Sequence, residues 1–210
     1  VWQMCEADLF DAPMRWMGKP GLESWDAISP PVRLLAQELS VEAGQRLLDL
    51  RCGTGVCGAL AARRGARVTL CDDAIVSVQA ARRTLELNGV DGEVVHGHAI
   101  TGPFDWVLLD APRGREWVRH LLGLAARTLH PDGKLLLAGP NRGGIKGYVQ
   151  DANEIVGPTE VVRYKAGHRL AAGRLRLAAT EPWPISSTQV VPVTLGGEAL
   201  RFATGSGVFS

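Results

Sequence analysis

The chain has 210 residues, a formal net charge of +1 and 46% hydrophobic residues, a composition typical of a globular protein with one medium-sized domain or one domain with an appendage. It contains no apolar run of the ~18 residues that a membrane-spanning helix needs, and its first ten residues, VWQMCEADLF, have no secretory signal pattern. These features exclude a membrane-spanning class and favour a cytoplasmic protein.

Four cysteines are present, and none of them has the CxxC spacing of a metal or redox site: Cys5, Cys52, Cys57 and Cys71. They fall mainly in apolar stretches, so we expect reduced, buried thiols in a cytoplasmic setting and no metal.

The predicted elements begin with an irregular N-terminal segment, residues 1–29, which is rich in Gly, Pro and Trp from Met14 on and has room for a hairpin. A helix is expected after Pro30-Pro31 and should end before Gly44, because its apolar residues follow helical spacing. Strands and helices then alternate as follows: strand 46–50, helix 55–64, strand 67–71, helix 74–88, strand 93–95, strand 104–109, helix 115–129 and strand 134–138.

Continuous apolar strands separated by amphipathic helices are typical of a parallel sheet covered on both faces. After Gly144 we expect a helix over 145–156 and then two strands, 159–166 and 168–177, joined by Ala166-Gly167 as an antiparallel hairpin. The sequence therefore predicts an α/β fold, a doubly wound, Rossmann-like sheet that is mostly parallel with an antiparallel final hairpin.

The composition changes at Thr180 to the linker-like stretch EPWPISSTQ. Beyond it, only two short strands are expected, at 189–193 and 198–203, which are too few to form a core. We therefore divide the chain into an N-terminal segment (1–29), a main domain (30–178) and a C-terminal stretch (179–210).

The sequence RLLDLRCGTGVCG, from Arg46 to Gly58, predicts a strand, a glycine turn and a helix. Such a turn lets a ligand approach the backbone where the helix presents unpaired N–H groups. Asp72 follows about twenty residues on, where an acidic side chain can hold the ribose hydroxyls of a nucleoside cofactor. The alternatives are a purely structural turn and a helix-capping role for Asp72, although Asp73 is the better candidate for the cap.

With these features and the final hairpin, residues 30–178 resemble class I S-adenosylmethionine-dependent methyltransferases. The strings CDDAIVSVQAARRTLELNGV, GPNRGGIKGYVQ and RYKAGHRLAAGRL resemble the methyltransferase small domain family, specifically enzymes that methylate the exocyclic N2 of guanine in ribosomal RNA. The resemblance implies S-adenosylmethionine as cofactor and ribosomal RNA as partner. It also implies two tandem copies of the fold: this chain would be the degenerate N-terminal copy, and residues 179–210 would lead into a C-terminal catalytic copy.

The cofactor loop of active family members reads DxGxGxG. Asp49, Gly53 and Gly55 match this pattern, but Arg51 replaces the first glycine. The arginine would crowd the place where the amino-acid end of the cofactor approaches, or it could fold away or pair with Asp49 or Asp110.

His98 stands where the family has the Asp that receives the adenine amino group. A neutral imidazole can accept one hydrogen bond, so His98 is a candidate cofactor-binding residue. The alternative is a histidine in a surface loop.

Amino-methylating members of the family end the next strand with Asn or Asp, two prolines and an aromatic ring that stacks on the base. Here the sequence is Asp110, Ala111, Pro112 and Arg113. Asp110 and Pro112 are therefore the candidate catalytic residues if the domain is active, but the stacking ring is missing.

Basic residues gather late in the chain, with seven Arg and Lys against three acidic residues between Asn141 and Arg176. The predicted RNA-binding residues in this region are Arg142, Lys146, Arg163, Lys165 and Arg169. An ordinary solvated face is an equally weighted alternative, and Trp106 and Trp117 are expected to pack in the core.

Two hypotheses follow. The departures at Arg51, His98 and Arg113 favour a catalytically silent module that binds ribosomal RNA or supports a catalytic partner domain. The alternative is an active S-adenosylmethionine-dependent RNA methyltransferase domain. A nucleotide-dependent oxidoreductase is disfavoured by the closing hairpin and by CGTG in place of GxGxxG.

Overall fold

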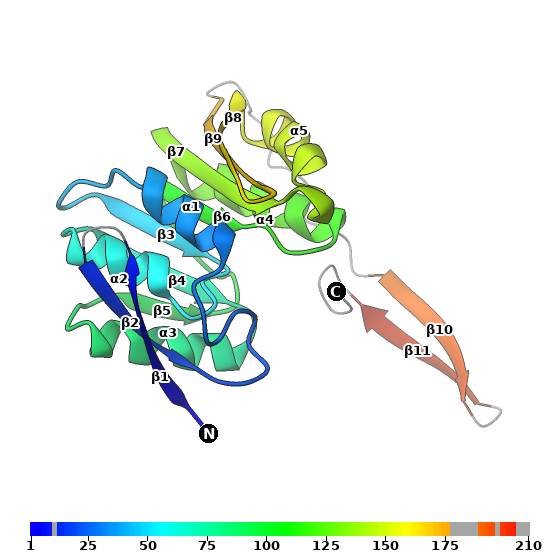
Figure 1. The fold of residues 1–210 in the computed structure, drawn as a ribbon. Helices are drawn as coiled ribbons and strands as arrows, with labels where there is room; N and C mark the ends of the chain where they lie inside the picture. Colours follow the sequence, from blue (N-terminus) through cyan, green and yellow to red (C-terminus); the bar gives the residue numbers. More distant parts are fainter. Residues whose placement is uncertain (10–11, 177–188, 196–197, 205–210) are drawn as a thin grey trace.

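A computed structural model describes residues 1–9, 12–176, 189–195 and 198–204 of the chain. Its centre is a seven-stranded sheet with the strand order β5-β4-β3-β6-β7-β9-β8 (Figure 1). The strands are β3 (Arg46–Leu50), β4 (Arg67–Asp72), β5 (Glu93–His96), β6 (Phe104–Asp110), β7 (Leu129–Pro140), β8 (Thr159–Lys165) and β9 (His168–Arg174). All neighbours from β5 to β7 are parallel, so the predicted doubly wound α/β sheet is confirmed.

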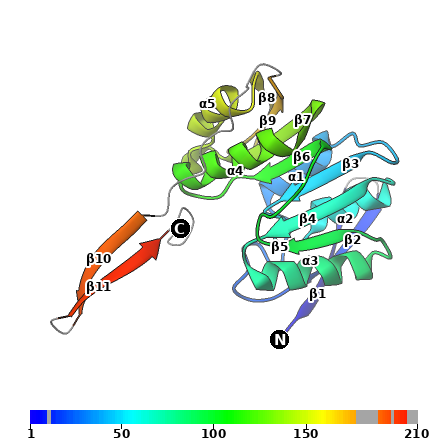
Figure 2. The same cartoon turned by 180° about the vertical axis from the view of Figure 1, so that it is seen from behind.

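Helices cover both faces of the sheet, as Figures 1 and 2 show from opposite sides. One face carries α1 (Pro30–Glu38), α2 (Val56–Arg63) and α3 (Ile75–Leu87), and the other carries α4 (Arg115–Thr128), the short 3-10 turn η1 (Asn141–Gly143) and α5 (Ile145–Ile155). The central strands contribute buried apolar residues to both layers, which explains why their sequences are continuous apolar runs.

The predicted strand and helix ends in this region differ from the observed ones by at most a few residues. The largest difference is β7, which begins at Leu129 rather than at residue 134. Leu129 is buried and pairs with Phe104 at the start of β6, so the strand extends back through the HPDG sequence that favours a turn.

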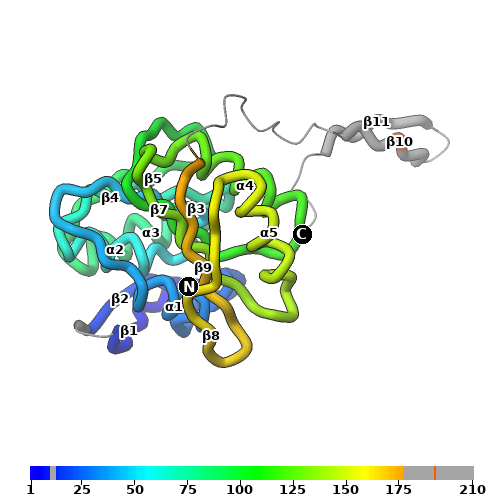
Figure 3. The backbone as a smooth tube through the Cα atoms, turned by 90° about the horizontal axis from the view of Figure 1, so that it is seen from above, coloured from blue at the N-terminus to red at the C-terminus, as the bar shows by residue number. Residues whose placement is uncertain are grey.

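The final hairpin belongs to the sheet, as predicted. β9 lies between β7 and β8 and is antiparallel to both. The last strand of this sheet in chain order is therefore an inner strand, and β8, which precedes it, forms the edge. Figure 3 follows the backbone from β7 through α5 and back along β8 and β9.

The expectation of an irregular segment over residues 1–29 is wrong for its first part. β1 (Gln3–Leu9) and β2 (Ala12–Gly18) form an antiparallel hairpin that packs on α3. Leu9, Met14 and Trp16 are fully or almost fully buried in the same core as α2 and α3. This burial makes the hairpin part of the main domain.

Hydrogen bonds also tie the hairpin to α3. The backbone N–H of Met17 donates to Thr84 Oγ1 at 3.2 Å. The Asn88 side chain bonds to both the N–H and the carbonyl of Arg15. Residues 19–29 then connect the hairpin to α1, whose N-cap is Ser29.

Near the end of the chain, β10 (Gln189–Leu195) and β11 (Glu198–Thr204) form a two-stranded antiparallel sheet, where two short strands were predicted. Residues 179–188, which make up most of the predicted linker, lie outside the described residues. No helix in the described ranges is both long and apolar enough to cross a membrane.

Candidate functional site

The candidate site lies at the carboxyl ends of β3, β4 and β6, where the order of the sheet changes direction and doubly wound folds bind their ligands. A cavity of about 330 Å³ opens there. Its lining includes Asp49, Asp72, Asp110 and Pro112, together with residues 21–24 of the loop that follows the N-terminal hairpin.

The glycine turn between β3 and α2 contains two glycines with different surroundings, of which Gly53 lines this cavity. Gly55 is the N-cap of α2 with φ +78°, and a Cβ there would lie 2.9 Å from the Cα of Ala81 in α3. Gly53 also has a positive φ, +55°, but open space surrounds it. Gly55 is thus required for packing α2 against α3, whereas Gly53 leaves the cavity wall open.

Asp72 ends β4 and joins two turns. One carboxylate oxygen accepts a hydrogen bond from Gly53 N–H at 3.0 Å, and the other accepts from Ala74 N–H at 2.9 Å. Burial raises the pKa of Asp72, while these two hydrogen bonds and nearby Arg51 oppose the rise. The expectation that Asp73 caps the next helix is wrong, because α3 begins after Ala74 without a side-chain cap.

Asp49 lies in β3 beneath the turn and is almost fully buried. Its carboxylate accepts a hydrogen bond from the N–H of Gly58, in the first turn of α2, at 3.0 Å. Burial raises the pKa of Asp49 to about 7. The hydrogen bond from Gly58 opposes the rise but does not compensate for the lost hydration, and the nearby carboxylates of Asp110 and Asp72 add to it.

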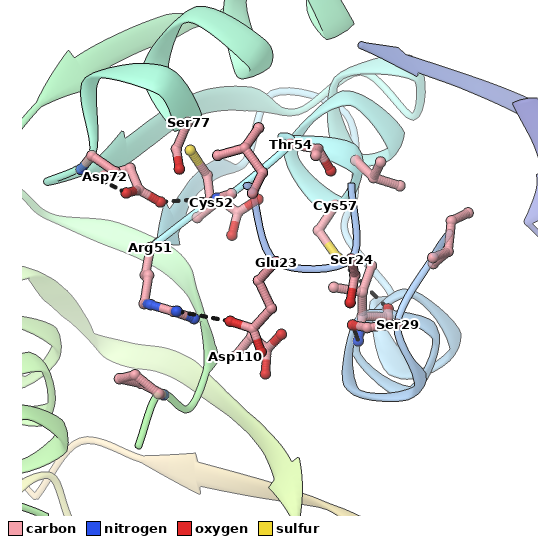
Figure 4. Close-up of a pocket in the computed structure, with 18 of the residues that line it drawn as sticks. Glu23, Ser24, Ser29, Arg51, Cys52, Thr54, Cys57, Asp72, Ser77 and Asp110 are labelled. Atoms are coloured by element: carbon pink, nitrogen blue, oxygen red, sulfur yellow. Dashed lines mark hydrogen bonds and ion pairs between the residues drawn. The ribbon is translucent and has the colours of Figure 1, made fainter. Parts of the chain in front are cut away.

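Arg51 crosses the cavity to reach a partner that the sequence analysis missed. Its backbone has φ +67°, a left-handed conformation that favours glycine. Its guanidinium donates to the Glu23 carboxylate at 2.9 Å (Figure 4). Burial lowers the pKa of Arg51, but the hydrogen bond and charge of Glu23 outweigh it and the net shift is upward. The Arg51 side chain lines this cavity and pairs with neither Asp49 nor Asp110, the two partners that the sequence suggested.

Asp110 ends β6 beside this ion pair. Burial raises its pKa to about 7; Arg51 opposes the rise and Glu23 adds to it. In the described part of the chain, no hydrogen bond reaches its carboxylate. Pro112 follows as a buried wall residue, and Arg113 is exposed.

A second cavity, of about 450 Å³, adjoins the first and shares Glu23, Arg51, Asp110 and Pro112 with it. Arg113 and His168 complete its outer side. The two predicted catalytic residues thus lie between the two cavities, with an arginine where an aromatic ring would be needed to hold a base.

His98 follows β5 and is half-buried, so it is not simply a histidine in a surface loop. Its ring meets the edge of Trp117 with centroids 5.4 Å apart, and Trp117 stacks on His120 at 4.9 Å. Burial lowers the pKa of His98, and its buried Nε2 has no hydrogen-bond partner within the described chain. Trp117 lines the first cavity, so a packing role alone does not describe this residue.

The predicted basic cluster is divided by the structure. Arg142 and Lys146 are exposed after β7, close to the β8–β9 turn, because Asn141 N–H donates to the Gly167 carbonyl at 2.8 Å. Lys165 and Arg169 lie at this same end of the hairpin. Arg163 instead forms a salt bridge of 2.6 Å with Glu38 of α1.

No group of three metal-binding side chains was found among the described residues. Cys52, Cys57 and Cys71 are buried free thiols with raised pKa values, mainly because of burial, and Cys5 is a partly buried free thiol. Their predicted state as unpaired, mostly buried thiols is therefore confirmed.

Comparisons with known proteins agree with this geometry. Residues 13–171 match the family model described as methyltransferase small domain. Proteins named ribosomal RNA small subunit methyltransferase C are similar over part of the chain: that of Pseudomonas putida is 39% identical over 97 residues, covering 45% of this chain and 29% of its own. That of Cronobacter sakazakii is 35% identical over 127 residues, covering 55% and 37%.

Solved structures extend the comparison. A T. thermophilus 16S rRNA N2 methyltransferase in complex with AdoMet and guanosine has a TM-score of 0.78 at 28% identity, covering 99% of this chain and 54% of that one. A methyltransferase from Pyrococcus furiosus shares the fold, with a TM-score of 0.62 at 19% identity. The chain thus spans about a third of the length of the curated relatives and about half of the T. thermophilus structure.

Proposed function

The chain belongs to the methyltransferase small domain family, and on that premise we propose that it serves an rRNA (guanine-N2) methyltransferase as a domain that contributes RNA affinity rather than methyl transfer. The names of the relatives support rRNA as the substrate of the whole protein. In this proposal, residues 30–178 with the N-terminal hairpin form the supporting domain, and residues 179–210 lead towards a C-terminal catalytic domain.

The observation that carries the proposal is the Arg51–Glu23 ion pair. Both side chains line the first cavity beside the glycine turn, where the methionine end of S-adenosylmethionine would approach the backbone. The pair is held between β3 and the loop at residues 19–29, so the cofactor could enter only after both side chains moved. A cationic guanidinium would also repel the cofactor's sulfonium and ammonium groups.

The nucleoside end of the cavity fits the cofactor better. Each Asp72 oxygen accepts one backbone hydrogen bond and retains a lone pair for a ribose hydroxyl. Gly53 leaves open space beside it, and Trp117 offers an aromatic wall. His98, the candidate for the adenine amino group, does not itself line the cavity, but its ring packs against Trp117, which does.

The amine site also lacks part of what methyl transfer needs. Bound S-adenosylmethionine supplies an activated methyl group, so the protein has to orient the amine and accept its hydrogen bonds. Asp110 could accept such a bond, but Arg113 is exposed and gives no fixed aromatic wall for the base. The alternative, an active methyltransferase domain, is favoured by the position of Asp110 and Pro112 beside both cavities.

Calorimetric titration of the purified chain with S-adenosylmethionine and its demethylated product tests the proposal. We expect weak binding or none, and we expect Arg51→Gly to strengthen it at least about tenfold by removing the guanidinium from the cavity. Arg113→Gly is the matched control, because it removes a neighbouring arginine without opening the glycine turn. Low-micromolar binding by the unaltered chain would contradict the proposal and favour an active methyltransferase domain.

A further inference from the structure

The side chain of Tyr164 is 65% exposed on β8, the edge strand of the sheet. Large aromatic side chains are usually covered in a folded domain, and the other described tyrosine, Tyr148, is buried. The exposed ring lies near the turn of the final hairpin, at the carboxyl end of β7.

The ring is supported from one side by an arginine. Tyr164 and Arg169 are directly paired across β8 and β9, so both side chains leave the same face of the sheet. The Arg169 guanidinium lies 5.7 Å from the ring centroid, and its Nε donates to Asn141 Oδ1 at 2.7 Å. The contacts between Tyr164, Arg169 and Asn141 therefore tie the ring to the η1 turn after β7.

Positive charge lies near this platform. Arg142 and Lys146 are exposed, and within the described ranges neither of them forms a salt bridge. Arg163 and Lys165 flank Tyr164 in β8 and therefore lie on the other face of the hairpin, where Arg163 is paired with Glu38. His168, the partner of Lys165 across the hairpin, lines the second cavity.

We propose that Tyr164 and Arg169 form a platform on which an unpaired base of single-stranded RNA stacks, while Arg142 and Lys146 hold the adjoining phosphates. This inference rests on the proposed function, since it names how the RNA is held. An exposed ring among unpaired cations is the combination that single-stranded binding uses, because every base offers a face for stacking and every phosphate offers a charge. Paired bases in an A-form duplex do not expose their faces to such a ring.

The test uses the full chain and an unstructured oligoadenylate that carries one 2-aminopurine, whose fluorescence falls when the base stacks. Tyr164→Val removes the ring and keeps a residue that favours strands, and we expect it to weaken binding about fivefold to a hundredfold and to abolish the fluorescence change. Tyr164→Phe keeps the ring and should bind within about twofold of the unaltered chain.

The matched control is Trp2→Ala. Trp2 also has cations over its ring, Arg83 at 4.3 Å and Lys19 at 5.7 Å. It precedes β1, at the end of the molecule away from the β8–β9 hairpin in Figures 1 and 2. Its removal should leave both affinity and fluorescence unchanged.

Salt dependence separates this inference from the proposed function. Neutralising Arg142 and Lys146 together should flatten the slope of log affinity against log salt by about 1.4 for single strands, whereas the loss in Tyr164→Val should be the same at every salt concentration. Equal affinity and equal quenching for Tyr164→Val and the unaltered chain would overturn the stacking platform and leave RNA binding intact. The stacking platform would also be overturned if the chain bound a duplex as tightly as the single strand, or if it bound no RNA. The absence of RNA binding would contradict the proposed function as well.

Discussion

The two ends of the first cavity differ in how much the fold depends on them. At the nucleoside end, Asp72 joins the Gly53 and Ala74 backbones and Gly55 allows α2 to approach α3. At the methionine end, Arg51 stands at a glycine position, and in the described part of the chain the Asp110 carboxylate receives no hydrogen bond. The motif residues that match the family are mostly those that the fold itself uses.

Under the proposed function, this difference explains how a recognisable cofactor motif can persist in a domain that does not use the cofactor. A change at Gly55 or Asp72 would weaken the packing or leave buried N–H groups unpaired, whether or not a ligand is bound. A change at position 51 or 113 affects mainly the ligand. A partly matching glycine motif is therefore weak support for cofactor binding until its structural roles have been separated from its binding roles.

The largest expected effect is at Gly55. Gly55→Ala should lower the free energy of unfolding by about 2–5 kcal/mol, because the new Cβ would overlap Ala81 and the residue would keep a positive φ. Gly53→Ala is the control, since it has the backbone strain without the overlap, and should cost only about 1–2 kcal/mol. Urea unfolding of both variants measures this, and equal losses would show that close packing is not what retains Gly55.

The next effect concerns the methionine end and depends on pH. The pKa of Asp110 is about 7 in the folded chain and 3.8 as its ordinary value, so the folded state binds more protons and stability falls as pH rises between about 4 and 7. At about 1.36 kcal/mol per pKa unit the full difference is about 4 kcal/mol, and solvent at the partly exposed residue reduces it, so Asp110→Asn should match the unaltered chain near pH 4 and be more stable by about 2–4 kcal/mol at pH 8.

Unfolding curves at both pH values measure the effect of Asp110→Asn. Asp91→Asn, an exposed carboxylate in the loop before β5, serves as control and should show no difference at either pH. A loss of stability at pH 8 in Asp110→Asn would mean that this carboxylate supports the fold in the way that Asp72 does.

The smallest effect is expected from Glu23→Gln. Side chains of the Arg51–Glu23 pair are 27% and 75% exposed, so its loss should cost only about 0.2–1 kcal/mol, with the difference shrinking at high salt. Glu6→Gln, which breaks the exposed Arg15–Glu6 pair, should cost a similar amount. If Glu23→Gln admits S-adenosylmethionine with Arg51 still present, then the fixed position of the arginine, and not its bulk, closes the cavity.

The sequence was sufficient to predict the sheet, its helices and the final hairpin, because those elements depend on local periodicity and turn residues. The N-terminal hairpin was only loosely anticipated. Its core residues, Leu9, Met14 and Trp16, come from two short strands, one of which contains Pro13, and their burial depends on helices that lie far along the chain.

In the site, the positions of Asp49, Asp72 and Asp110 at one cavity followed from strand ends that meet at one sheet edge. Glu23 could not be predicted as the partner of Arg51, because the two residues are 28 positions apart, with α1 and β3 between them, and Glu23 lies in a loop that has no periodic pattern. Tyr164 was likewise overlooked, because only the fold shows which aromatic on an edge strand is uncovered.

The position of β9 also bears on self-association. Without β9, the sheet would end at β7, whose Leu135, Leu136 and Leu137 would form an open, apolar edge able to pair with another chain. With the hairpin in place, the sheet ends at β8, which carries charged residues and has an irregular register between Val161 and Arg163. Because a growing polypeptide emerges from its N-terminus, β7 stays unprotected until residues 168–174 have been made, and the interval before the hairpin closes is when this protein is most exposed to aggregation.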